Sequence, residues 1–221
     1  DADINIAVEA TIAGSYSGAG QKCTASSRLV VLESIHDRYV DALIKRMGQL
    51  KVGHALEKDV FMGPVVDDKQ LAANFDWIDK AHQHGAELAF GGQRLELEHE
   101  GYYMSPTLLL NTQNDWDLNQ EEVFAPLASV IKVTDLDEAI ATVNDTRFGL
   151  TSGIITQSLR SSALFKQQAQ TGCVMVNLPT AGTDYHVPFG GRKQSSFGPR
   201  EQGQYAKEFY TVIKTAYQRP Y

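Results

Sequence analysis

The sequence has 221 residues, of which 43% are hydrophobic and 21% charged, and its 20 Lys and Arg against 27 Asp and Glu give a formal net charge of −7. This acidic balance, without a dense cluster of Lys or Arg, argues against a nucleic-acid-binding or anionic-membrane-binding surface. No apolar run approaches the length of a membrane span, so we expect a cytoplasmic protein without a membrane partner.

Helical and strand patterns alternate along the chain. The predicted helices cover residues 3–13, 37–50, 67–84, 136–143 and 158–169. The predicted strands cover residues 29–32, 86–90, 108–110, 127–133, 151–155 and 173–176. Beyond Gln202 the chain is predicted to form a short helical turn and then a strand over 209–216. This alternation is typical of an α/β fold, with a layered, mostly parallel sheet and flanking helices.

Cys23 lies between the first predicted helix and the first predicted strand. Glycine, serine and threonine surround it from Gly18 to Ser27, and these residues favour turns and exposed backbone amides. A lone cysteine is most often a buried structural residue, but this composition favours an exposed nucleophile. A free thiol is only about 3% thiolate at pH 7, so catalysis needs a nearby positive field or amide donors. Lys22 is one candidate source of that field.

The second cysteine, one glycine and two histidines give no further candidate for catalysis or metal binding. Cys173 lies in a predicted strand and is interpreted as a buried structural residue, so the two cysteines do not form a disulfide framework. Gly172 fits a C-terminal cap for the helix before it. His82 and His84 are two residues apart on a predicted helix, so they face different directions and do not form a metal pair. We expect no metal site.

Three motifs, in order along the chain, resemble the aldehyde dehydrogenase superfamily. The first is a Gly-Gln-x-Cys motif that ends at Cys23, and the second is the Glu-Glu-x-Phe-x-Pro segment Glu121–Pro126. The third is a late block that begins Pro-Phe-Gly-Gly at Pro188. The resemblance extends over essentially the whole chain and matches the second half of such an enzyme. It implies a catalytic domain over 1–201, a tail over 202–221, and a fragment that lacks the N-terminal dinucleotide-binding half.

The resemblance implies oxidation of an aldehyde to a carboxylic acid with NAD or NADP. Cys23 is then the nucleophile that forms a thiohemiacetal and a thioester, with its backbone N–H as one oxyanion donor. By the same resemblance Glu122 binds the nicotinamide ribose and Phe124 packs near the nicotinamide. Taken singly, Glu122 is also typical of a surface acid and Phe124 of a core aromatic residue.

The resemblance also assigns substrate-binding and proton-transfer roles. Phe189 borders the aldehyde tunnel, and Lys22 and Thr24 flank the nucleophile as further substrate-binding residues. Glu201 falls where the family has an acid behind the active site, which gives a proton-relay hypothesis beside its interpretation as a solvated carboxylate. The stretch 177–188 is similar to the subgroup that oxidises α-ketoglutaric semialdehyde. That anionic substrate calls for a cation, and the basic groups near the motifs are Lys22, Arg192 and Lys193.

Some of the family's machinery has no counterpart in this chain. The general-base Glu and the oxyanion-hole Asn lie upstream of the nucleophile in the family, and no Gly-x-Gly-x-x-Gly fingerprint is present. We therefore expect little activity from the chain alone. The family's C-terminal strand pairs with another subunit, which implies a homo-oligomer, a dimer or a tetramer, built through the 209–216 strand.

Two alternatives stay open from the sequence. A cysteine hydrolase would use His186 to activate Cys23 and Asn177 to orient the histidine, although it leaves the second and third motifs unexplained. A non-catalytic oligomerisation module on a dehydrogenase-like domain is the other, and the intact Cys23 motif argues against it.

Overall fold

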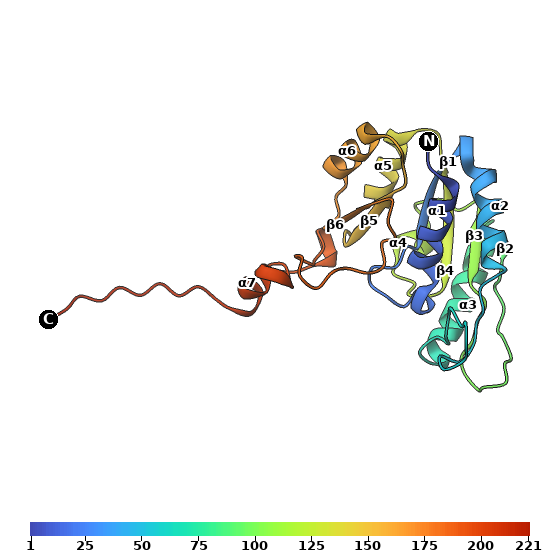
Figure 1. Ribbon diagram of the computed structural model, residues 1–221, viewed down its shortest axis with the longest axis horizontal. Helices are drawn as coiled ribbons and strands as arrows, with labels where there is room; N and C mark the ends of the chain where they lie inside the picture. The colour runs from blue at the N-terminus through green and yellow to red at the C-terminus, as the bar shows by residue number, and fades with distance from the viewer.

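The computed structural model describes residues 1–221 and has the elements labelled in Figure 1. The helices are α1 Ile4–Thr11, α2 His36–Met47, α3 Asp68–Gln83, α4 Asp117–Gln120, α5 Leu136–Asn144, α6 Leu159–Gln168 and α7 Ala206–Tyr210. The strands are β1 Arg28–Leu32, β2 Glu87–Phe90, β3 Thr107–Leu110, β4 Leu127–Val133, β5 Thr151–Ile154 and β6 Cys173–Val176.

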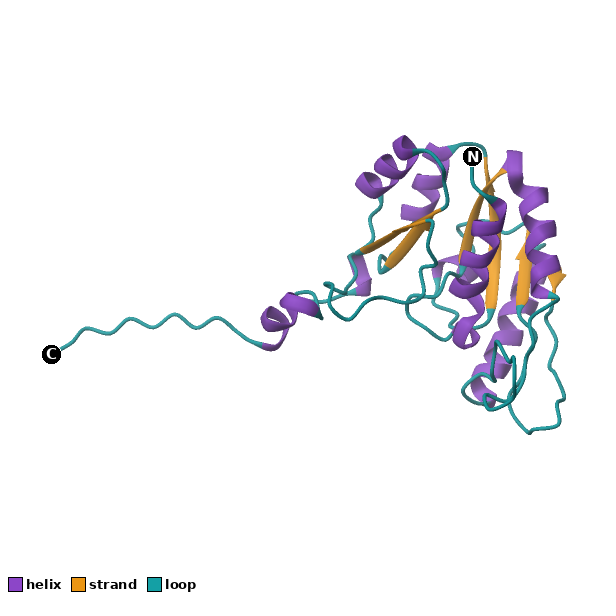
Figure 2. Cartoon of the chain, in the orientation of Figure 1, coloured by secondary structure: helices purple, strands orange, loops and turns teal.

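The strands form two separate sheets flanked by helices (Figure 2). The larger sheet has the order β1-β4-β3-β2, in which β1 and β3 run parallel to β4 and only β2 is antiparallel. In the smaller sheet β5 runs parallel to β6. The α/β prediction with a mostly parallel sheet is confirmed, with the difference that the sheet is divided between β1 and β5.

The main core surrounds the two inner strands of the larger sheet. Every residue of β3 is buried, and β4 is buried except at Lys132, as expected for strands covered on both faces. Tyr16 is fully buried, and its hydroxyl donates a hydrogen bond of 3.1 Å to the Thr107 carbonyl at the start of β3. This bond ties the segment after α1, which leads to Cys23, to the centre of the sheet.

Polar side chains fix where four of the helices begin. Asp3, Asp67, Asp135 and Ser158 each precede a helix and accept hydrogen bonds from backbone N–H groups of its first turn. Each such N-cap stabilises its helix by about 1 kcal/mol. These caps explain why α1, α3, α5 and α6 begin within two residues of the sequence-predicted starts.

Three local differences from the sequence predictions have physical causes. The first helix continues beyond Thr11 as a π-helical turn, Ile12–Tyr16. Gly172 lies four residues beyond the end of α6 and does not cap it. Glycine is needed here for a different reason, because a Cβ would come within 1.8 Å of the Gly190 carbonyl oxygen. Cys173 opens β6 as predicted but is only half-buried.

The C-terminal tail also differs from its prediction. Phe209 and Tyr210 end α7, and residues 211–221 extend away from the molecule without a partner strand (Figure 1). A strand needs a neighbour to pair its backbone groups, and a single chain offers the tail none. The oligomerisation strand therefore stays a prediction. No helix in the structure has the combined length and apolar character that crossing a membrane requires.

Candidate active site

The loop that carries Cys23 follows a sharp reversal of the chain after α1. A 3₁₀ turn spans Ser17–Gly20, and Gly18, Ala19 and Gly20 have φ values of +62°, +56° and +65°. This left-handed region is unfavourable for a residue with a Cβ, so the conformation of Ala19 is held by its buried surroundings. The reversal leaves Cys23 exposed at the surface.

Two contacts fix this loop to distant parts of the chain. A Cβ at Gly20 would lie 2.0 Å from the Ala125 carbonyl oxygen, so the backbone of the second motif packs directly on the loop. The Gln21 side-chain oxygen accepts a hydrogen bond of 2.9 Å from the Val66 backbone N–H. Gln21 of the Gly-Gln-x-Cys motif therefore anchors the loop and leaves the thiol free.

The residues that flank the nucleophile point in different directions. The Lys22 ammonium donates a hydrogen bond of 3.1 Å to the Ser17 hydroxyl, so it lies back over the preceding turn. Thr24 is buried. The backbone N–H groups of Cys23 and Thr24 donate no hydrogen bond within the chain, so both remain free to stabilise an oxyanion.

The two adjacent acids of the second motif differ in their partners. Glu121 forms an ion pair with Arg147. Glu122 is exposed and has neither a hydrogen bond nor an ion pair with the rest of the chain. Of the two acids, Glu122 is therefore the one whose carboxylate is unpaired; its assignment to the cofactor stays a prediction.

Phe124 adopts an unusual backbone conformation beside this free acid. Its φ is +59°, which for a bulky residue indicates strain held by the surrounding structure. Val123 and Ala125 on either side are buried, whereas the Phe124 side chain is 38% exposed. The strained backbone thus turns an aromatic ring outward next to Glu122.

One cavity connects several of these residues. Cys23, Glu121 and Glu122 line one cavity of about 620 Å³, and Lys22, Glu122 and Phe124 line a smaller adjoining one of about 40 Å³. The structure therefore gathers Cys23, Glu122 and Phe124 in one region, although the first two are 99 positions apart in the sequence. No group of His, Cys, Asp and Glu in the chain has the arrangement of a metal site.

Phe189 and Glu201 are neighbours in an isolated antiparallel bridge. Their backbones pair with each other through N–H···O bonds of 2.8 and 2.9 Å, and neither residue lines the two cavities. The Glu201 side chain is exposed and forms no hydrogen bond. From the third block it is Gln194 and Ser195 that reach the larger cavity, and Ser195 accepts a hydrogen bond of 2.9 Å from the Gly149 N–H.

The residues of the hydrolase alternative are not assembled. Asn177 is bound on both sides of its amide to the backbone of Thr156, with distances of 2.9 and 3.0 Å. His186 is exposed, and its ring contacts Tyr185 edge-on at 5.4 Å between centroids. With its amide engaged in this way, Asn177 does not orient His186 toward Cys23.

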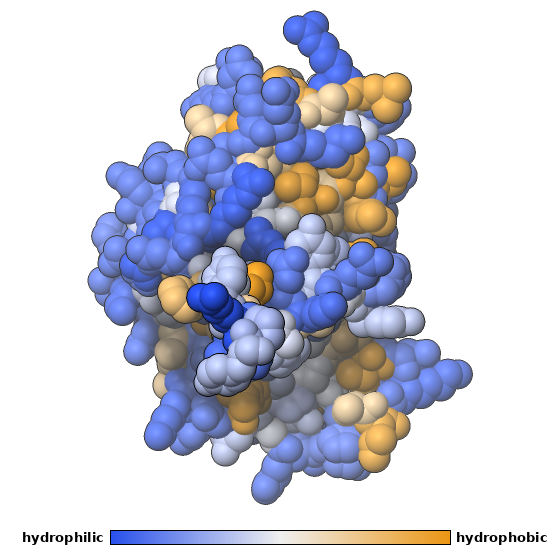
Figure 3. Space-filling view, turned by 90° about the vertical axis from the view of Figure 1, so that its left-hand side faces the viewer, coloured by the Kyte–Doolittle hydropathy of each residue, from blue (hydrophilic) through white to orange (hydrophobic).

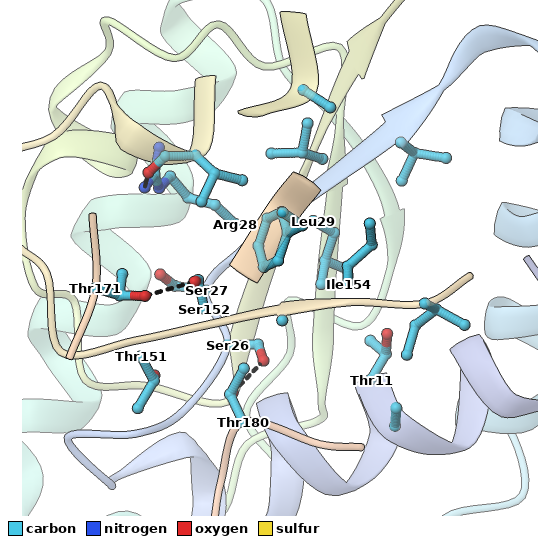
Figure 4. A pocket seen from close by; sticks show the side chains of 18 of the residues that line it. Thr11, Ser26, Ser27, Arg28, Leu29, Thr151, Ser152, Ile154, Thr171 and Thr180 are labelled. Atoms are coloured by element: carbon cyan, nitrogen blue, oxygen red, sulfur yellow. Dashed lines mark hydrogen bonds between the residues drawn. The ribbon is translucent and has the colours of Figure 1, made fainter. Parts of the chain in front are cut away.

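Sequence reasoning missed several residues that hold the site together. Ser26 shares a hydrogen bond of 2.6 Å with Thr180, which joins the loop that carries Cys23 to the segment after β6 (Figure 4). Arg147 forms an ion pair with Glu121, and the Val66 backbone N–H donates a hydrogen bond to the Gln21 side chain. No local sequence signal identifies these partners, because each contact joins residues far apart in the chain.

Comparison with protein-family models matches residues 1–216 to the Aldehyde dehydrogenase family. The chain is 40% identical over its whole length to an alpha-ketoglutaric semialdehyde dehydrogenase of Bacillus subtilis, of which it covers 46%. It is 36% identical over 98% of its length to a 2,5-dioxopentanoate dehydrogenase of Saccharolobus solfataricus, of which it covers 45%. The chain thus spans less than half the length of these relatives.

The fold of this chain is also similar to solved structures of aldehyde dehydrogenases. A betaine aldehyde dehydrogenase from Staphylococcus aureus in complex with NAD+ superposes with a TM-score of 0.92 at 33% identity, over 96% of this chain and 42% of that one. An NAD+ complex of an aldehyde dehydrogenase from Bacillus cereus superposes with a TM-score of 0.91 at 33% identity, over 97% and 43%.

Proposed function

Because this chain belongs to the aldehyde dehydrogenase family, we propose that it is the catalytic part of an NAD(P)-dependent aldehyde dehydrogenase. The observation that carries the proposal is the meeting of exposed Cys23 and unpaired Glu122 at one cavity. Residues 1–201 then form the catalytic domain, and the dinucleotide-binding half belongs to the rest of a longer protein.

Cys23 starts the reaction as a thiolate that attacks the aldehyde carbon. The carbonyl oxygen becomes an oxyanion, and the free N–H groups of Cys23 and Thr24 are the donors that stabilise it. Loss of a hydride from the former aldehyde carbon leaves a thioester on Cys23. Water then adds to the thioester carbonyl, the thiolate leaves, and the carboxylic acid is released with the thiol ready for another cycle.

The residues around Cys23 fit the nicotinamide end of the cofactor. A nicotinamide cofactor, when bound, supplies the hydride acceptor. Glu122 has an unpaired carboxylate, which suits it to accept hydrogen bonds from ribose hydroxyls, and Phe124 exposes an aromatic face beside it. The NAD+ complexes of the Staphylococcus aureus and Bacillus cereus relatives support NAD as the first cofactor to test.

For the substrate we propose α-ketoglutaric semialdehyde or a similar anionic semialdehyde, which the names of the first two curated relatives support. Its carboxylate needs a cation. Lys22 is bound to Ser17, and Lys193 donates to the Asn144 and Thr146 carbonyls, whereas exposed Arg192 has no side-chain partner. Arg192 is therefore the candidate among the three, because a guanidinium binds a carboxylate bidentately.

The tail over 202–221 supports a homo-oligomer. Val212 and Ile213 are 93% and 99% exposed on an extended segment, which suits strand addition to a second subunit. Figure 3 shows the face from which this tail projects, where hydrophobic residues lie in separate patches between hydrophilic ones. A reducing, cytoplasmic setting fits the two free thiols, Cys23 and Cys173.

The experiment is aldehyde-dependent reduction of NAD or NADP by the full-length protein, with a panel of aldehydes that includes α-ketoglutaric semialdehyde. Cys23→Ala is expected to abolish reduction, and Cys173→Ala, the matched control at the other thiol, is expected to retain it. No reduction with any aldehyde by a folded, cofactor-binding protein would mean that the family resemblance describes the fold alone.

A further inference from the structure

One polar residue lies in the middle of the buried face of α3. Leu71, Ile78 and Ala81 are buried on this face, and Asn74 between them has no exposed surface. Their spacing of three and four residues places them on one side of the helix, which packs on the main core. An apolar residue at position 74 would complete the stripe, so the asparagine has a reason other than packing.

The hydrogen bonds of Asn74 offset only part of the cost of burying it. Its amide nitrogen donates to the Met104 sulfur at 3.2 Å, and a thioether is a weak acceptor. Its amide oxygen accepts a hydrogen bond of 2.7 Å from the side chain of Gln70, one turn earlier on α3. Burial of an amide is unfavourable unless strong hydrogen bonds replace those with water. Asn74 therefore adds little to stability, and its one strong contact is with Gln70.

Gln70 also binds the second motif. The same side-chain nitrogen donates a hydrogen bond of 3.2 Å to the Val123 carbonyl, which has no other donor in the chain. Asp67 and Gln70 have the spacing of a capping box, in which the glutamine side chain binds back to the N-cap backbone N–H. The Asp67 side chain does accept from the Gln70 N–H at 2.8 Å, but the Gln70 side chain extends to Asn74 and Val123 instead.

The bond to Val123 supports the segment that carries the proposed cofactor-binding residues. The Val123 carbonyl belongs to the peptide unit that leads into Phe124, whose φ is +59°. Beyond Phe124, the Ala125 carbonyl packs against Gly20. A strained backbone conformation persists only where its surroundings hold it. Gln70 and Gly20 therefore hold this segment from both sides of Phe124.

The beginning of α3 also supports the loop that carries Cys23. The backbone N–H of Val66, immediately before the N-cap residue of α3, donates to the Gln21 side chain at 2.9 Å. The first turns of α3 and the residue before them are thus bound to the loop of Cys23 and to the segment of Glu122. This helix is a common support for the two parts of the candidate site.

We propose that Asn74 is a positioning residue for the segment that carries Glu122 and Phe124. It holds the Gln70 amide against the Val123 carbonyl, and the segment keeps the conformation in which Glu122 is free and Phe124 faces outward. The inference rests on the proposed function, in which these two residues bind the cofactor. Because Asn74 is buried, it acts on the site through Gln70.

NAD affinity of the full-length protein tests the proposal. Asn74→Leu nearly preserves the side-chain volume and removes the bond to Gln70, so we expect about fivefold to tenfold weaker NAD binding. The Tm should be unchanged or raised, and turnover at saturating NAD little changed. Gln83→Leu, at an exposed position of the same helix, is the control and should retain the parent affinity. Unchanged affinity in Asn74→Leu, where Glu122→Gln does weaken binding, would overturn the proposal.

A double-mutant cycle separates positioning from a general structural role. Gln70→Leu removes the donor to Val123, so Asn74→Leu should cause no further loss of NAD affinity in that background. Losses that add in the double variant would mean that Asn74 acts by a route other than Gln70, which contradicts the proposal.

Hydrogen exchange without cofactor distinguishes a failure of this inference from a failure of the proposed function. Exchange across residues 121–127 of the full-length protein should be faster in Asn74→Leu than in the parent and in Gln83→Leu, because the segment loses its support. Unchanged exchange would overturn the positioning role whatever the NAD data. Faster exchange, together with unchanged NAD affinity in Glu122→Gln, would support the positioning of the segment and refute the cofactor role of Glu122.

Discussion

Gly20 lies against the carbonyl of Ala125 so closely that a Cβ at position 20 would come within 2.0 Å of the oxygen. This approach joins the loop that carries Cys23 to the segment that carries Glu122 and Phe124. Residues about a hundred positions apart in the chain are thereby held in one arrangement, and the position of Cys23 relative to Glu122 depends on a glycine.

Gly20→Ala is expected to disrupt this arrangement. The added methyl group meets a backbone oxygen, and φ at this position is +65°, so both sterics and backbone strain oppose the substitution. We expect a loss of stability of about 2 kcal/mol or more and a strong fall in turnover. Gly63→Ala is the matched control, because no atom lies within 4 Å of a Cβ there. Denaturant unfolding and steady-state kinetics of both variants measure the difference, and equal behaviour would contradict the close packing.

Substitutions at the two neighbouring acids, Glu121 and Glu122, should have different effects on stability and on cofactor binding. Glu122→Gln removes the unpaired carboxylate, so we expect weaker NAD or NADP binding and lower turnover with the fold intact. Glu121→Gln instead breaks the partly exposed ion pair with Arg147, which costs less than about 1 kcal/mol of stability. Cofactor titration and kinetics distinguish the two. If Glu122→Gln leaves cofactor affinity and turnover untouched, the assignment of Glu122 is wrong.

Arg28 supports the end of α5, where Val143 lines the larger cavity. Its guanidinium donates to the carbonyls of Thr142 and Val143 at 2.9 and 3.0 Å, and burial lowers its pKa while nearby Asp145 acts in the opposite direction. Arg28→Leu leaves these carbonyls without their donor, so we expect a loss of about 2 to 3 kcal/mol. Arg38→Leu, at an exposed position of α2, should change stability by less than about 0.5 kcal/mol. Urea unfolding of both variants checks this, and equal midpoints would refute it.

The stability of the folded chain should fall in alkaline solution, because buried tyrosines ionise less readily than they do in the unfolded chain. Burial raises the pKa of Tyr39 from 10.0 to about 12, although a hydrogen bond with Thr11 acts in the opposite direction. Below pH 10 the phenol is neutral in both states and its full contribution is present. As the pH rises through this interval the unfolded state ionises first, so about 2 kcal/mol of stability is lost between pH 10 and 12.

The check on this pH dependence is unfolding across that interval with Tyr39→Phe. The variant should lose less stability than the parent chain between pH 10 and 12, because only the parent has a hydroxyl to ionise at this position. Tyr16, whose pKa burial also raises, retains part of the dependence in both proteins. Identical pH profiles for the two proteins would rule out the contribution of Tyr39.

The elements and their order follow from local sequence patterns. The β4 and β6 boundaries were predicted to the residue, because their apolar runs are bounded by turn residues or charges, and N-capping side chains locate α3 and α5. The motifs also single out Cys23 and Glu122, which line one cavity in the structure. These are the parts of the structure that are encoded over short stretches of sequence.

The remainder depends on contacts that no local pattern contains. The bond from Val66 to Gln21 and the bond between Ser26 and Thr180 join distant segments, and the positive φ of Phe124 is imposed by its buried neighbours. The division of the sheet between β1 and β5 was not predicted either. Pairing between parallel strands is non-local, so a list of strands does not say which edges remain free.

The most direct test of the central claim is to locate the acyl intermediate. The full-length protein is mixed with NAD or NADP and α-ketoglutaric semialdehyde, quenched in acid during turnover, and mapped by peptide mass spectrometry. We predict the mass of the acyl group on the peptide that contains Cys23, none on the peptide that contains Cys173, and no adduct in Cys23→Ala. An acyl group on Cys173, or sustained cofactor reduction by Cys23→Ala, would contradict the assignment of Cys23 as the nucleophile.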